Sequence, residues 1–246
     1  MAGPVRALLL DLDDTLLLND ADRFLSHYFR ALVAKVQDVV SVGRFADALS
    51  VATRAMERND GSNGTNAEVF TREFFRRVGR PPGELMPLFD DFYAHEFEEL
   101  GVLTAVDPAA RGLVEWAFEQ GLQVAIATQP MFPRVAIETR LRWADVPCDE
   151  FPYHWVACYE EMHACKPHPH FFLEILEGLG RRPEECLMVG DSPDADMPAR
   201  DLGLRTYLVD RGAYPDADDV PCDARGDLRH LLALLQTGGI DDLRGR

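Results

Sequence analysis

Three aspartates lie within four positions at the end of an apolar run near the start of the chain. The run Ala7–Leu10 is followed directly by Asp11, and Asp13 and Asp14 come after one intervening leucine. Carboxylates at the end of a buried segment cost free energy unless cations or hydrogen bonds compensate them. A carboxylate pair at this spacing can hold a divalent cation, act as a nucleophile or transfer protons.

Further reactive side chains follow later apolar segments. Thr128 and Gln129 come directly after one such segment, and GDSPDAD, with Asp191 and Asp196, comes directly after another. Lys166, the only lysine in the second half of the chain, follows a third at a short distance. Because ligands of open α/β sheets bind at the carboxyl ends of the strands, we expect these side chains to meet in one crevice.

Such a crevice would hold several carboxylates, which repel one another strongly. Mg²⁺ prefers oxygen ligands, and Asp11 and Asp191 are the expected direct ligands. Lys166 adds a second positive charge. A metal ion, a lysine and the hydroxyl of Thr128 aimed at one point suit the spread negative charge of a transferring phosphoryl group.

The elements that must position these residues alternate between strands and helices over most of the chain. Short Val-, Leu- and Ile-rich segments without polar alternation are typical of a parallel sheet covered on both faces. The expected strands are Val5–Leu10, Leu122–Ala127, His154–Ala157, Cys186–Val189 and Thr206–Val209. The expected helices between and after the later strands are Asp107–Gln120, Phe132–Trp143, Pro169–Leu179, a short one ending at Leu202, and Asp227–Gln236. The pattern predicts a doubly wound, Rossmann-like α/β core.

More than a hundred residues without a convincing strand separate the first two expected strands. The segments with helical periodicity are Ala21–Val40, Arg44–Asn59, Ala67–Val78 and Pro82–Leu100. We therefore expect an all-helical cap at residues 19–102, inserted between a first core part, 1–18, and a second core part, 103–246.

Composition narrows the choice of partners and compartment. The formal charge of −17 disfavours a nucleic-acid partner. No apolar run is long enough for a membrane span, and the start of the chain is a poor signal peptide. Five scattered cysteines without CxxC spacing favour free thiols, so we expect a cytoplasmic protein. No sequence feature fixes the oligomeric state, and we expect a monomer or a small homo-oligomer.

These motifs together resemble the haloacid dehalogenase-like superfamily, in its phosphatase branch. DLDDT, Asp11 to Thr15, resembles the first family motif, DxDx[TV]. Thr128 matches the second motif, Lys166 the third and GDSPDAD the fourth, in the same order and spacing. The helical insertion is similar to the family's cap. The resemblance implies a Mg²⁺-dependent phosphatase that acts on a small phosphorylated metabolite.

The resemblance also implies roles for the acidic residues. Asp11 would be the nucleophile that forms an aspartyl phosphate, and Asp13 the general acid and then the general base. Mg²⁺ would be bound by the carboxylates of Asp11 and Asp191 and by the main-chain carbonyl of Asp13. Asp196 would not bind the metal directly. It would either position the groups that do, or orient Lys166.

Thr128, Gln129 and Lys166 are the residues that the resemblance places around the substrate phosphate. Gln129 departs from the family pattern, because members often carry asparagine there. Pro198 lies two residues after Asp196, so the helix that follows should have this proline in its first turn.

Other functions stay open at this point. A phosphomutase would use the same groups and return the phosphoryl group to a sugar. Halide release is disfavoured by Asp13, because hydrolytic dehalogenases of the family replace the second acid of DxD, typically by tyrosine. A non-catalytic binding protein is disfavoured by the intact set of acids, hydroxyl and lysine. A zinc site in Cys158–His170 is also disfavoured, because its spacing fits no common structural zinc pattern.

Two features of the cap are open to two interpretations. The segment Asn59–Asn66, NDGSNGTN, is either a specificity loop at the crevice or a solvated turn between helices. A set of aromatic residues with helical spacing fits the cap core better than substrate contact. These residues are Phe24, Tyr28, Phe70, Phe74 and Phe75.

Overall fold

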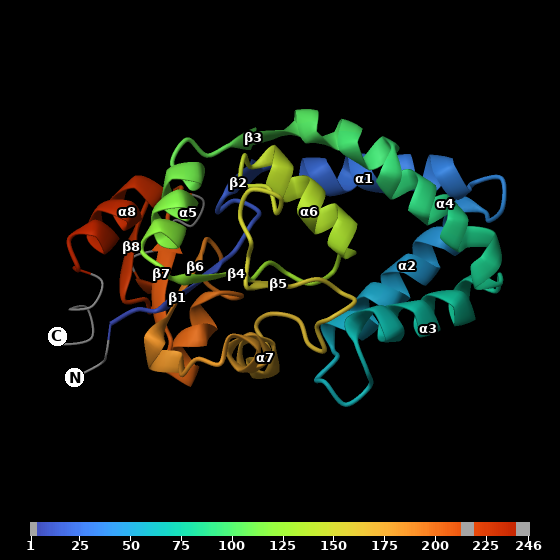
Figure 1. The fold of residues 1–246 in the computed structure, drawn as a ribbon. Helices are drawn as coiled ribbons and strands as arrows, with labels where there is room; N and C mark the ends of the chain where they lie inside the picture. Colours follow the sequence, from blue (N-terminus) through green and yellow to red (C-terminus); the bar gives the residue numbers. More distant parts are fainter. Residues whose placement is uncertain (1–3, 213–218, 240–246) are drawn as a thin grey trace.

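The computed structural model describes residues 4–212 and 219–239. Its core is a six-stranded parallel sheet in the order β5-β4-β1-β6-β7-β8 (Figure 1). The strands are β1 (Ala7–Leu10), β4 (Gln123–Ile126), β5 (Trp155–Val156), β6 (Cys186–Gly190), β7 (Arg205–Val209) and β8 (Ala224–Gly226). The first strand in sequence is therefore central, as in doubly wound folds.

Both faces of the sheet are covered, which explains why its strands lack polar alternation. Leu8 and Leu10 of β1 pack on one face, and Ala7 and Leu9 pack on the other; all four are fully buried. The first face carries α5 (Ala110–Glu119), α6 (Arg134–Trp143) and α8 (Leu228–Gln236), and the second carries α7 (Pro169–Leu179) and the 3₁₀ helix η3 (Met197–Leu202). The expected α/β core is confirmed, and Pro198 lies in the first turn of η3.

Three strands were missing from the sequence-based prediction. The residues between the first two expected strands contain β2 (Leu17–Asn19) and β3 (Thr104–Val106), which pair antiparallel, and β8 extends the sheet at its edge. Each has three residues, which is too short for a periodic pattern. Val106 of β3 is also 43% exposed, so this strand lacks the buried run that revealed the others.

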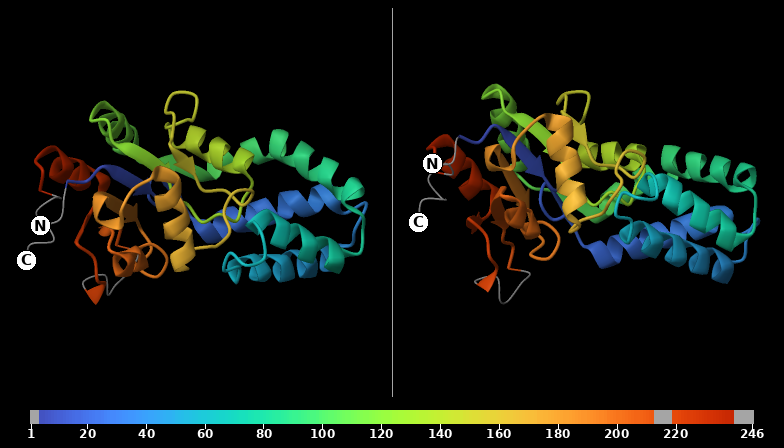
Figure 2. Two further views of the ribbon diagram at one scale, coloured as in Figure 1. Left: turned by 60° about the horizontal axis from the view of Figure 1, so that its bottom comes forward. Right: turned by 90° about the horizontal axis from the view of Figure 1, so that it is seen from below.

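Four helices and a 3₁₀ helix lie between β2 and β3. They are α1 (Ala21–Val36), α2 (Val42–Glu57), α3 (Asn66–Val78), α4 (Pro82–Ala94) and η1 (Glu96–Leu103). They form a lobe beyond one end of the sheet in both views of Figure 2. Their core is aromatic, with Phe24, Phe45, Phe74, Phe92 and Phe97 buried. The paired strands β2 and β3 carry both connections, and the cap boundaries at residues 19 and 102 stay a prediction.

Local sequence signals set the ends of these helices. Asp20 caps α1 by accepting from the main-chain N–H of Arg23, and Thr65 and Glu68 form a capping box at the start of α3. One helix was expected to run to Leu100, but α4 ends at Ala94 and η1 follows. The backbone leaves the α-helical conformation at His95, and Phe97 of η1 packs in the cap core. Among the described residues, no helix combines the length and apolar character needed to cross a membrane.

The segment Asn59–Asn66 joins the cap to the core. The main-chain N–H of Asn66 donates to Met162 (2.7 Å), and that of Ala67 donates to Tyr159 (2.7 Å). The buried amide of Asn66 also donates to the Ala164 carbonyl (3.2 Å). The ends of this segment are therefore held against the loop that leads to Lys166, while its tip is exposed. Neither a specificity loop at the crevice nor a solvated turn between helices describes the segment completely.

Replacing Asn66 by alanine should lower the free energy of unfolding by about 2 kcal/mol, because buried partners lose their hydrogen bonds. The lost bonds are those to the Ala164 carbonyl and from the Asn59 amide (3.0 Å). Asn63→Ala, at the exposed tip, is the matched control and should change stability by less than about 0.5 kcal/mol. Chemical denaturation measures the free energy of unfolding of both variants. Equal losses of stability would contradict a stabilising role for the hydrogen bonds of Asn66.

Candidate active site

Asp11 and Asp191 stand at the carboxyl ends of two neighbouring strands. Asp11 directly follows β1, its main-chain N–H donating to Val189 of β6 (2.9 Å), and Asp191 directly follows β6. Carboxylate oxygens of Asp11, Asp191 and Asp196 lie within 4.8 Å of one another. The structure thus brings together three acids that are up to 185 positions apart in the chain, at the point where the strand order reverses.

Lys166 lies at the centre of this acidic group. Its ammonium donates to Asp11 Oδ1 (2.7 Å) and to Asp196 Oδ1 (2.6 Å), and its side chain is only 3% exposed. Burial works against the charged form, but the two carboxylates outweigh it and raise the pKa of Lys166. The residue is therefore a fixed positive charge beside Asp11.

Asp196 is fixed by its surroundings. Its second oxygen accepts the main-chain N–H of Ser192 (3.1 Å), and the side chain is fully buried. Gly190 leaves room for it, because a Cβ there would come within 2.1 Å of Asp196 Oδ2. Both carboxylate oxygens of Asp196 thus have partners, one of them Lys166, and the orienting role of Asp196 stays a prediction.

Thr128 and Gln129 occupy the end of β4, the neighbour of β1 on its other side. Thr128 is buried there. The Gln129 side chain accepts from the Lys166 main-chain N–H (2.9 Å) and donates to the Lys166 carbonyl (3.2 Å). The glutamine therefore positions the lysine loop, and a contact between either residue and substrate phosphate stays a prediction.

The acidic cluster has the electrostatics of a cation site. Burial, opposed by Lys166, raises the pKa of Asp11 to about 7, and burial together with repulsion by Asp11 raises the pKa of Asp191 to about 8. Ionising both groups is therefore costly without a further positive charge. Oxygen ligands at this separation fit Mg²⁺, so the residues present suit the expected metal.

Asp13 contacts a residue that no sequence pattern singled out. One oxygen accepts from the Asn19 amide (3.1 Å), and the other pairs with the guanidinium of Arg140 on α6. Arg140 is 2% exposed and lies 4.6 Å from the centre of the Phe132 ring. It fixes the Asp13 side chain, which remains 31% exposed toward the cap.

The five cap aromatics belong to the cap core and also line a cavity, and their contact with substrate stays a prediction. Phe24 and Phe74 are buried in the cap core, and all five also line a cavity between the cap and the core. The loop Met131–Pro133 and Asp13 line the same cavity, which therefore reaches the active site.

Comparison with known proteins agrees with this architecture. The family model described as haloacid dehalogenase-like hydrolase matches residues 5–200. The chain is 28% identical to a phosphoserine phosphatase of Thermus thermophilus, over 93% of this chain and 98% of the relative. It is 29% identical to a ribulose-1,5-bisphosphate 5-phosphatase of Halopiger xanaduensis, over 71% and 72%.

The fold is also shared with solved structures. A 2-haloacid dehalogenase from Pseudomonas syringae pv. Tomato DC3000 superposes with a TM-score of 0.62 at 21% identity, over 95% of this chain and 99% of that one. This likeness concerns the fold, since the identity is low. With the family model covering most of the chain and the motif residues gathered at one edge of the sheet, the protein belongs to the haloacid dehalogenase-like hydrolases.

Proposed function

We propose that this hydrolase is a Mg²⁺-dependent phosphomonoesterase that acts on a small phosphorylated metabolite through an aspartyl phosphate. The observation that carries the proposal is the buried Lys166 ammonium between Asp11 and Asp196. A carboxylate mounted on the central strand beside a fixed cation is a suitable nucleophile for an anionic ester. The names of the two phosphatase relatives support the same chemistry.

In the first step, an Asp11 oxygen attacks phosphorus and the bond from phosphorus to the leaving oxygen breaks. Asp13, in its protonated form, gives its proton to that oxygen, so the alcohol leaves neutral. Asn19 and Arg140 hold the Asp13 side chain for this transfer.

In the second step, water attacks phosphorus of the aspartyl phosphate and the bond to Asp11 breaks. Asp13 now takes a proton from the water, which restores both carboxyl groups and releases inorganic phosphate. Lys166 and Thr128 would contact phosphoryl oxygens in both steps, and Gln129 would contact them or hold the lysine loop in place.

Mg²⁺ would be held by the carboxylates of Asp11 and Asp191 and by the main-chain carbonyl of Asp13. Asp196 would position these groups without binding the ion. When bound, the ion supplies positive charge that offsets the repulsion between the phosphoryl group and the carboxylates. Asp13 also separates this proposal from halide release, since a departing halide needs no proton.

Removal of divalent cations with EDTA should lower phosphate release from p-nitrophenyl phosphate at least about tenfold, and Mg²⁺ should restore it. Mg²⁺ should also raise the melting temperature by several degrees, because it binds the folded state. Asp191→Asn should abolish that rise, while Asp194→Asn, exposed in the same loop, should keep it. A protein unaffected by EDTA in both activity and melting would refute the metal site.

The cellular compartment, the class of partner and the oligomeric state of the protein are also proposals. Five free cysteines support a reducing compartment, which favours the cytoplasm. The net charge of −17 favours a small-molecule substrate over nucleic acid or a membrane surface. A monomer or small homo-oligomer is the expected state.

A further inference from the structure

A large cavity lies on the cap side of Asp13. Its volume is about 840 Å³, in the upper part of the range for pockets that take drug-sized ligands. Residues of α1 to α4 form most of its wall, and the loop Met131–Pro133 and Arg140 close the core side. Because Asp13 is the proton donor to the leaving oxygen, the cavity lies where the alcohol part of the ester must sit.

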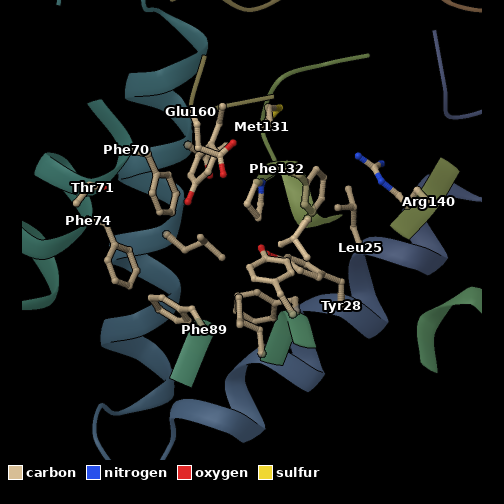
Figure 3. A pocket seen from close by; sticks show the side chains of 18 of the residues that line it. Leu25, Tyr28, Phe70, Thr71, Phe74, Phe89, Met131, Phe132, Arg140 and Glu160 are labelled. Atoms are coloured by element: carbon tan, nitrogen blue, oxygen red, sulfur yellow. The ribbon is translucent and has the colours of Figure 1, made fainter. Parts of the chain in front are cut away.

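The wall of the cavity is aromatic. Figure 3 shows Phe70, Phe74 and Phe89 on one side of a shared space, with Tyr28 and Phe132, whose ring centroids lie 5.3 Å apart, on the other side. The hydroxyl of Tyr28 pairs with that of Tyr93 (2.8 Å), so these two polar groups satisfy each other. Faces and edges of aromatic rings pack favourably against another ring in offset or perpendicular arrangements.

The charges around the cavity disfavour a second anionic group on the substrate. Glu57, Asp90 and Glu160 are exposed carboxylates that line it. Among the described residues, Arg140 is the only basic residue in the lining. Its Nη1 pairs with Asp13, and its other donors, Nε and Nη2, are buried from solvent and have no hydrogen-bond partner in the described part of the chain.

We propose that the substrate is the monophosphate ester of a bulky alcohol that carries an aromatic ring and no second anionic group. This inference rests on the proposed phosphatase function and names its substrate class. It separates this chain from the reactions named for its relatives, because phosphoserine adds a carboxylate and ribulose-1,5-bisphosphate adds a second phosphate.

A series of phosphate esters of primary alcohols tests the substrate class, because their leaving oxygens have similar acidity. From ethyl to 2-phenylethyl to 2-(2-naphthyl)ethyl phosphate, kcat/KM should rise about tenfold per added ring as apolar area is buried. 2-Cyclohexylethyl phosphate, matched in size to the phenyl ester, should be about threefold poorer. O-Phosphoserine and phosphoglycolate should fall below the phenyl ester.

Two variants on α3 link this preference to the cavity. Thr71→Trp places bulk in the wall and should reduce the ratio of kcat/KM for the naphthyl ester to that for the ethyl ester at least about tenfold. Arg72→Trp, the next residue, lies outside the lining and its side chain is 52% exposed, so the ratio should stay as in the wild type.

The outcomes separate this inference from the proposed function. Asp11-dependent hydrolysis of the ethyl ester without gain from rings, or with a preference for phosphoserine, would overturn the substrate class and leave the phosphatase intact. Equal values for the cyclohexyl and phenyl esters would overturn the aromatic preference. Failure to hydrolyse any ester of the panel with Mg²⁺ present would overturn the phosphatase proposal itself and the substrate class with it.

Discussion

Asp11→Asn should reduce phosphate release from p-nitrophenyl phosphate by at least about 10⁴-fold, because an amide oxygen does not attack phosphorus. The substitution keeps the shape of the side chain. Lys166 would still pair with Asp196, and loss of one of three crowded carboxylates removes repulsion. The variant should therefore fold, with a melting temperature in EDTA no lower than that of the wild type.

Two measurements make this expectation specific. Rapid acid quench followed by intact-mass analysis should detect one added phosphoryl group on the wild-type protein and none on Asp11→Asn. Asp194→Asn, the same change at an exposed position of the loop after β6, should show wild-type turnover. Activity of Asp11→Asn within tenfold of the wild type would show that another group is the nucleophile.

The core and the acid cluster could be predicted from the sequence for one physical reason. Strands buried on both faces are apolar without alternation, so β1, β4 and β6 stand out as runs, and polar residues directly after them mark the carboxyl edge of the sheet. Asp11 and Asp191 follow their strands with no intervening residue, so their meeting depends only on the strand order.

Contacts between distant side chains could not be predicted in the same way. Arg140 is 127 positions from Asp13 and lies in a helix where arginine is ordinarily solvated, so no local pattern marks it as buried. The bond of Gln129 to the lysine loop and the docking of Asn66 likewise depend on how cap and core pack. Contacts of this kind can be identified only from the three-dimensional structure.

Asp13→Asn should affect poor leaving groups far more than good ones. For ethyl phosphate, kcat/KM should fall about 10³-fold, because the alkoxide needs a proton as it leaves. For p-nitrophenyl phosphate the fall should be about tenfold or less, because nitrophenolate leaves without one. The quantity to compare is kcat/KM, since it covers the steps up to aspartyl phosphate formation and excludes the later hydrolysis.

The second role of Asp13 predicts a separate signature in the same variant. Hydrolysis of the aspartyl phosphate would lack its base, so p-nitrophenyl phosphate should give a burst of nitrophenol equal to the enzyme concentration, followed by slow turnover. Asp14→Asn is the matched control: Asp14 has a positive φ of 54°, which asparagine tolerates, and its carboxylate accepts only the main-chain N–H of Asn19 among the described residues. It should show no burst. Equal losses of kcat/KM for both esters would contradict the role of Asp13 as general acid. A missing burst would contradict its role as general base. The two outcomes are independent, because each role acts on a different bond.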